Sequence, residues 1–170
     1  MKTRIKKLSN EIIRVFKPCY DPSELGIEES ECLPIVEAIQ KYRSKVRNNS
    51  DIIWILCREE FMSEKDMRLF AVWCARQALK LVDNPYKRSI EVCNVAEKFA
   101  NGEATRDELK AARVASGFAS PVADDNAADA AAAAAEVAAA AAADAACADA
   151  WSAAYADARD AQVEQLLTYF

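Results

Sequence analysis

An alanine-rich tract near the C-terminal end is the feature that most constrains the fold of this chain. Of the 35 residues from Ala127 to Ala161, 23 are alanine, and the stretch from Ala127 to Phe170 contains neither Gly nor Pro. Alanine is the strongest helix former because ordering it costs no side-chain entropy and buries no polar group. The tract is therefore expected to be helical.

The length of the tract raises the question of whether it forms one helix or two. An unbroken helix from Asp125 to Thr168 would be about 65 Å long, whereas a globular chain of this size has a radius of gyration of about 15 Å. The helix would project far from the body unless it broke. Because the tract has no Gly or Pro, a break or bend is expected near Asp144 to Asp149.

Charge is distributed unevenly along the 170 residues. Residues 1–113 carry 21 Lys or Arg and 18 Asp or Glu, whereas residues 114–170 carry one Arg and nine carboxylates. An acidic half of this kind is typical of a solvated helix face, of a surface that meets a basic protein, or of a mimic of nucleic-acid charge. Direct binding of DNA or RNA is not expected, because phosphate contacts need clustered Lys and Arg.

The residues needed for common catalytic and cofactor chemistry are missing. The chain has no His, which removes the usual general base, and its three glycines stand apart, so no phosphate-binding loop is present. None of the six cysteines forms a Cys-x-x-Cys pair, so neither a zinc site nor any other metal or cofactor is expected. The chain is accordingly predicted not to be an enzyme.

The cysteine pattern and the apolar runs also bear on location. Free cysteines that lie on apolar helix faces, such as Cys74 and Cys93, behave as small hydrophobic residues. No signal-like apolar run follows Met1, and carboxylates interrupt the alanine tract, so no membrane span is expected. The sequence therefore predicts a reduced, cytoplasmic protein.

Helical periodicity and capping signals place further helices before the tract, and no segment is typical of a strand. Helices are predicted over 5–16, 33–47, 52–60, 64–82, 86–100 and 105–115. Ser63 is expected to cap one of them, and Thr105 with Glu108 matches a capping box, in which each side chain binds a free backbone N–H of the other residue. The large apolar residues expected in the core are Trp54, Leu69, Phe70, Trp73, Leu79, Ile90 and Phe99.

One face of the last predicted helix carries a stripe of large residues. Cys147, Trp151 and Tyr155 follow one another at a spacing of four, and Gln162 and Leu166 continue the stripe. Such a stripe is typical of contact with a core, and a binding surface is the alternative. The candidate partner-binding residues, taken from this stripe and from the acidic face across the helix, are Asp149, Trp151, Tyr155, Asp157, Asp160 and Glu164.

Four motifs resemble a family of alanine-rich helical proteins of bacteria and phages, some of whose members are labelled toxin-immunity proteins. The motifs are FMSEKDMRLFAVWCARQAL at 61–79, SIEVCNVAEKFANGEAT at 89–105, DELKAA at 107–112 and ARDAQ at 158–162. The resemblance covers residues 51–170. It implies an all-α fold and a role in neutralising another protein.

Together these observations predict an all-α, multi-helix bundle followed by a long Ala-rich helix that is continuous or broken into two. A helical region over 1–50, a helical core over 51–120 and an acidic helical segment over 121–170 would form one continuous fold. The expected function is non-catalytic inhibition of a toxin or host-defence effector by stoichiometric binding, with the acidic helix steering association toward a basic surface. A structural protein that self-associates through its alanine faces is the alternative, which leaves homo-oligomerisation open.

Overall fold

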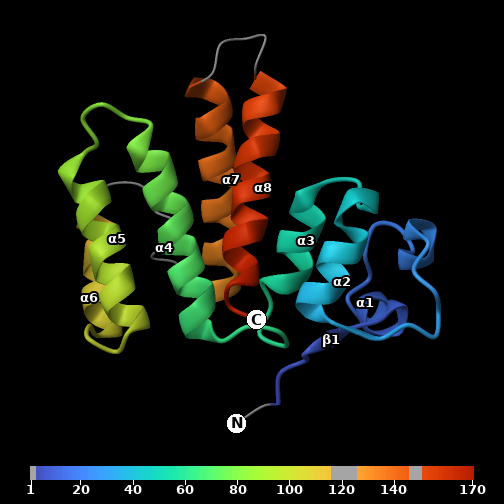
Figure 1. Cartoon of the computed structure of the whole chain (residues 1–170). Coiled ribbons are helices and arrows are strands. Elements are labelled where there is room, and N and C mark those ends of the chain that lie inside the picture. The colour runs from blue at the N-terminus through green and yellow to red at the C-terminus, as the bar shows by residue number, and fades with distance from the viewer. Residues whose placement is uncertain (1–2, 116–125, 146–150) are drawn as a thin grey trace.

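The computed structural model describes residues 3–115, 126–145 and 151–170, and these residues are predominantly helical. The N-terminal part is built from short elements joined by irregular chain (Figure 1). Its elements are β1 (Lys7–Leu8), α1 (Asn10–Val15), the 3-10 helix η1 (Pro22–Leu25), β2 (Leu33–Pro34), α2 (Ile35–Tyr42), the 3-10 helix η2 (Arg43–Lys45) and α3 (Asn49–Leu56).

Longer helices form the remainder of the molecule. In Figure 1, α5 and α6 lie at one side and the N-terminal elements at the other, with α4, α7 and α8 between them. The helix α7 packs against both α4 and α8, and α8 also contacts α3, so α8 joins the two parts. The five helices are α4 (Glu64–Lys80), α5 (Lys87–Ala100), α6 (Arg106–Ala115), α7 (Ala127–Ala145) and α8 (Trp151–Leu167).

The Ala-rich segment forms two helices that lie side by side (Figure 1). The first is described to Ala145 and the second from Trp151, so the prediction of two helices is confirmed, whereas most of the predicted break region, Asp144 to Asp149, lies outside the described residues. Packing decides this arrangement, because a pair of helices buries alanine faces that a projecting helix would leave in water. Six alanines of α7 are at most 5% exposed: Ala127, Ala130, Ala131, Ala134, Ala135 and Ala138.

The predicted capping interactions are present at two helix starts. The Ser63 hydroxyl accepts a hydrogen bond from the Asp66 backbone N–H at 2.9 Å. The Glu108 N–H donates to the Thr105 hydroxyl at 3.2 Å, and the Thr105 N–H donates to the Glu108 carboxylate at 2.6 Å. These bonds satisfy backbone donors that have no partner inside the helix.

The helix predicted over residues 5–16 is wrong in its first half. Residues 5–8 are extended: β1 pairs antiparallel with β2, and the Ile5 N–H donates to the Glu60 carbonyl at 2.8 Å. The Ser9 side chain accepts from the Ile12 N–H and starts α1 at Asn10. Backbone pairing with distant segments therefore outweighs the helical spacing of the apolar residues.

The core prediction is confirmed for some residues and wrong for others. Phe70 is fully buried and stacks on Trp73 with ring centroids 6.5 Å apart. Leu69, Trp73, Leu79 and Phe99 are partly buried. Trp54 and Ile90 are each 40% exposed, contrary to the prediction.

Five of the six cysteines are described, and all five are free thiols; the sixth, Cys147, lies outside the described residues. Cys19 and Cys32 are exposed, whereas Cys57, Cys74 and Cys93 are buried. Burial raises the pKa of Cys57 to about 12 and also raises the pKa values of Cys74 and Cys93. Because the thiolate is the reactive form, the buried thiols should react slowly.

This difference predicts the pattern of alkylation in the native protein. Iodoacetamide at pH 8 should modify Cys19 and Cys32 at least about tenfold faster than the three buried thiols. Peptide mapping by mass spectrometry measures each rate, and labelling in denaturant, where all thiols are accessible, is the control. Equal rates at Cys57 and Cys19 in the native protein would contradict the assigned burial.

Candidate functional site

A pocket of about 350 Å³ lies among the N-terminal elements. Apolar side chains from β1, α2 and α3 form much of its wall, including the buried Leu8, Ile39, Ile52 and Ile55. The connector between α1 and β2 supplies the other side through Pro18, Tyr20 and Leu25, among others. The volume is within the range of pockets that bind ligands or partner side chains.

The size of the pocket distinguishes it from an ordinary packing defect. A closed and empty cavity of this volume would destabilise the fold by on the order of 8 kcal/mol, which is comparable to the total stability of a typical domain. The pocket must therefore be open to water or filled. Cys19, Asn48 and Trp54 line it and are exposed, which places its mouth near these residues.

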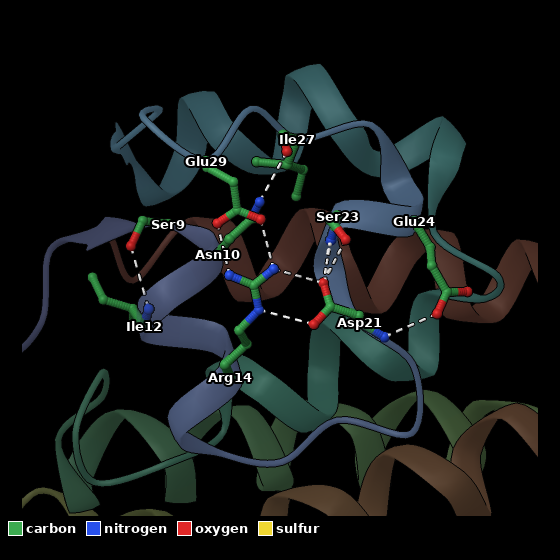
Figure 2. Close-up of polar contacts among 9 residues, drawn as sticks. All are labelled: Ser9, Asn10, Ile12, Arg14, Asp21, Ser23, Glu24, Ile27 and Glu29. Carbon is green, nitrogen blue, oxygen red and sulfur yellow. Dashed lines mark hydrogen bonds and ion pairs between the residues drawn. The ribbon is translucent and has the colours of Figure 1, made fainter.

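One arginine holds the connector that forms the outer wall. Figure 2 shows the Arg14 guanidinium between the carboxylates of Asp21 and Glu29. Arg14 donates two hydrogen bonds to Asp21, both at 2.8 Å, and two to Glu29, at 2.7 and 2.6 Å. Paired bonds of this kind fix orientation as well as distance, so Arg14 ties α1 to both ends of the 21–29 segment.

Two further contacts fix the same segment. The fully buried Asn10 donates from its amide to the Ile27 carbonyl at 2.8 Å. Asp21 and Glu24 form a capping box around the start of η1, with Pro22 at its first position. The connector is thus an ordered wall although it contains little regular structure (Figure 2).

The Arg14 contacts predict a pH dependence of stability. Arg14 lowers the pKa values of Asp21 and Glu29 below their ordinary range. The stabilisation is therefore fully present above the ordinary carboxyl pKa of about 4 and is lost as the pH falls through the lowered values. The melting temperature of the wild type should exceed that of Arg14→Gln by a constant margin from pH 7 to about 5. This margin should shrink as the pH falls toward 2.

Thermal melts followed by circular dichroism between pH 2 and pH 7 measure this margin. Arg88→Gln is the matched control, because Arg88 bonds to the Ala115 carbonyl and not to a carboxylate in the described part of the chain. Its margin should not vary with pH. A margin for Arg14→Gln that widens on acidification would contradict the arrangement.

Two tyrosine–carboxylate pairs contribute to the pocket wall. The Tyr20 hydroxyl donates to Asp51 at 2.8 Å, and the Tyr42 hydroxyl donates to Glu31. Burial and the Asp51 bond raise the pKa of Tyr20 to about 12. The Glu31 bond, together with burial, raises the pKa of Tyr42. Both hydroxyls therefore stay protonated at neutral pH, and they hold structure instead of supplying a catalytic base.

The mouth of the pocket carries aromatic rings stacked with arginines. Trp54 is 40% exposed, and the Arg58 guanidinium lies 4.3 Å from the centroid of its indole ring. The Arg47 guanidinium lies 4.4 Å from the Tyr20 ring centroid. Trp, Tyr and Arg around a hollow are the residue types enriched at protein-binding surfaces.

The candidate residues predicted on the last helix have a different setting. Asp160 pairs with Arg43 at 2.8 Å, and Glu164 also pairs with Arg43. The Asn49 amide donates to Asp160. These contacts attach α8 to η2 and α3, so two of the predicted acidic residues hold the molecule together.

The remaining predicted residues divide between contact, solvent and the undescribed part of the chain. The Tyr155 hydroxyl bonds to the Glu136 carboxylate at 3.1 Å, which joins α8 to α7. Asp157 is exposed. Asp149 and the Trp151 side chain lie outside what the structure describes.

The stripe on α8 is a core contact where it is described. Leu166 and Gln162 are buried, and the Gln162 amide donates to the Ala135 carbonyl of α7 at 2.8 Å. The buried Arg159 pairs with Glu136 and donates to Gln162 at 3.0 Å. This network fixes how the two Ala-rich helices pair, because alanine faces alone offer little to select a register.

A double-mutant cycle measures the link between α8 and η2. Arg43→Met and Asp160→Asn should each destabilise slightly, with a coupling energy of about 0.5 kcal/mol, as is typical of a partly exposed pair. Urea unfolding of the two single variants and the double variant gives the coupling. Asp157→Asn is the control and should not couple to Arg43→Met, so equal coupling would refute the pairing.

Sequence patterns alone did not indicate the pocket. Its wall combines residues from seven short elements spread over 8–55, together with residues of the irregular chain between them. Periodicity detects faces of single helices, and it does not detect a hollow between several. The only usable signal was Trp54, whose place on an apolar helix led to the prediction that it is buried.

A metal site, a membrane-spanning helix or a known relative would also indicate a function. In the described ranges, no group of three or more His, Cys, Asp and Glu could hold a metal ion. None of the helices searched in these ranges is long and apolar enough to cross a membrane. No protein-family model, curated protein or solved structure matches the chain.

Proposed function

We propose that this protein acts without catalysis, by stoichiometric binding of one protein partner that inserts an apolar side chain into the pocket of residues 8–55. The pocket is mostly apolar and has the volume to take a large side chain. Association of this kind is driven by removal of apolar surface from water.

The observation that carries this proposal is the exposed Trp54 at the mouth of the pocket. Trp, Tyr and Arg dominate the binding energy of protein interfaces, especially around a central hollow. Trp54 with Arg58 and Tyr20 with Arg47 supply this composition, and each ring is already stacked. Stacking in the free protein reduces the entropy lost when a partner binds.

The class of partner is inferred from the sequence. The resemblance of residues 51–170 to an alanine-rich family with members labelled as toxin-immunity proteins supports a toxin or a host-defence effector as the partner. Binding would neutralise it by covering its surface. The pocket lies mainly before residue 51, so the residues that bind would fall largely outside the region of resemblance.

Self-association through the Ala-rich helices is the alternative function, and the packing favours it less. The alanine face of α7 is already covered inside the molecule, where six alanines are buried. The helix α7 also contacts both α4 and α8. A second copy using that face would have to displace one of these helices.

The test is affinity capture from the native host with wild-type protein and two variants, followed by quantitative mass spectrometry. Trp54→Ala removes the exposed ring at the pocket. Tyr86→Ala is the matched control. Tyr86 is 57% exposed and stacks with Arg88, but it does not line the pocket. A partner recovered with wild type should be retained by Tyr86→Ala and reduced at least about tenfold by Trp54→Ala, as for a residue that dominates an interface.

The captured protein is then purified, and its stoichiometry is measured by light scattering. A one-to-one complex that depends on Trp54 supports the proposal. A partner held equally by all three proteins refutes the pocket as its site. If the purified wild-type protein forms a homo-oligomer without a partner, and the Trp54→Ala variant forms the same homo-oligomer, the alternative is supported.

A further inference from the structure

A second hollow adjoins the pocket and extends its surface toward α8. This groove has a volume of about 760 Å³ and lies between η2, the start of α3 and α8. Arg43, Val46, Asn48 and Ser50 line both the pocket and the groove. The two hollows are therefore neighbours that share part of their lining.

The groove is more polar than the pocket, and its charged lining residues are mainly basic. Three arginines line it, Arg43, Arg47 and Arg159, against one carboxylate, Asp160. Most of its other lining residues are Ser, Asn, Gln and Tyr, which donate hydrogen bonds. Asp160 already accepts bonds from Arg43 and Asn49, so these two donors are occupied and a ligand carboxylate would have to bind elsewhere in the groove.

Arg47 is the cation best placed to meet a ligand. Its side chain is 64% exposed, and its ion pair in the described structure is a 3.2 Å contact with the half-exposed Glu24. Such a pair contributes little and is readily exchanged. Arg43 and Arg159 are engaged with Asp160, Glu164 and Glu136.

Arg47 also lies where the pocket and the groove meet. Its guanidinium stacks on Tyr20, which lines the pocket, while Arg47 itself lines the groove. Stacking leaves the edge of a guanidinium available to donate hydrogen bonds to a carboxylate. A group bound to Arg47 would therefore lie close to a side chain seated in the pocket.

We propose that the groove binds an acidic, extended segment of the protein partner, with a carboxylate paired to Arg47 and a neighbouring apolar side chain seated in the pocket. This inference rests on the proposed function and specifies the chemistry of the partner. The partner surface is then acidic at this site, whereas a basic surface was expected opposite α8.

Synthetic acetylated peptides of four residues serve as probes, each titrated into ¹⁵N-labelled full-length protein. The acidic peptide is leucine-aspartate-glutamate-aspartate, and the neutral one replaces these acids with asparagine and glutamine. A third peptide replaces the leucine of the acidic peptide with alanine. Amide shifts of Ser44, Arg47 and Asn49, which line the groove and not the pocket, report the groove, and fitted dissociation constants compare the peptides.

The acidic peptide should bind at least about threefold more tightly than the neutral one at low salt, and the difference should shrink at high salt. Arg47→Gln should abolish this preference, and Arg47→Lys should keep part of it. Arg88→Gln, which alters another arginine stacked on an exposed tyrosine, is the control and should leave the preference unchanged.

The peptides separate this inference from the proposed function. Equal binding of the acidic and neutral peptides, or a preference for the acidic peptide that persists in Arg47→Gln, overturns the acidic groove. Even then, weaker binding of the peptide in which alanine replaces leucine still supports the pocket. No loss on that replacement counts against the pocket and hence against the proposed function. Absence of any shift at millimolar peptide contradicts both.

Discussion

Phe70→Ala should lower the free energy of unfolding by about 3–5 kcal/mol, the usual range for removing a fully buried aromatic ring. Phe70 is 0% exposed on α4, and its ring stacks on Trp73. Truncation removes apolar contacts and leaves a cavity that the surrounding helices can fill only in part. For a chain of this length the melting temperature should fall by roughly 10 °C. Urea unfolding followed by circular dichroism measures the change.

Trp54→Ala is the informative comparison, because it removes a larger ring from a partly exposed position. It loses the stacking with Arg58, which contributes about 0.5–1 kcal/mol at exposed sites, and the burial of the covered part of the ring, so its cost in stability should be smaller than that of Phe70→Ala. The two variants should therefore separate stability from binding: Phe70→Ala destabilises, and Trp54→Ala chiefly weakens partner capture. Losses of equal size in the unfolding measurement would show that the burial of one of these rings is misassigned.

Ala134→Leu should destabilise the protein by about 2–3 kcal/mol, since a larger side chain overpacks a filled interface. Ala134 is 1% exposed, and its neighbours Ala130, Ala131 and Ala135 are fully buried. The small side chains allow α7 to pack against α4 and α8 at once. A leucine at this position must push one helix away or adopt a strained rotamer.

Ala133→Leu is the matched control in the adjacent position of the same helix. Ala133 is exposed, and leucine is almost as good a helix former as alanine, so the change should stay within about 0.5 kcal/mol. Chemical unfolding of both variants compares the two faces of α7. If Ala133→Leu destabilised as much as Ala134→Leu, the assigned buried face would be wrong.

The helices were largely predictable from local sequence. The α4 and α6 starts follow from Ser63 and Thr105, whose side chains satisfy backbone donors close by in the chain. The helices α7 and α8 were predicted from the alanine content of the tract. Their division into two helices was predicted because one unbroken helix would be much longer than a globule of this size. Propensity and capping act between residues close together in the chain, so they can be recognised in the sequence without knowledge of the fold.

The candidate site was much less predictable. The acidic residues Asp160 and Glu164 were expected to steer a partner, yet they pair with Arg43, more than a hundred residues earlier. Trp54 was expected in the core but is partly exposed beside a pocket. In both cases the outcome depends on what lies opposite the residue in space, and neither residue type nor helical spacing contains that information.

The sequence by itself determined that this chain is helical and where most of its long helices begin and end, because propensity, capping and the absence of Gly and Pro act between near neighbours. Tertiary structure alone decided that residues 5–8 pair as extended chain, that the alanine face of α7 is buried, and that a pocket opens among the N-terminal elements. These features depend on contacts between segments far apart in the chain. Their free energy comes from surface removed from water and from backbone groups paired across the fold, so it exists only once the helices are assembled.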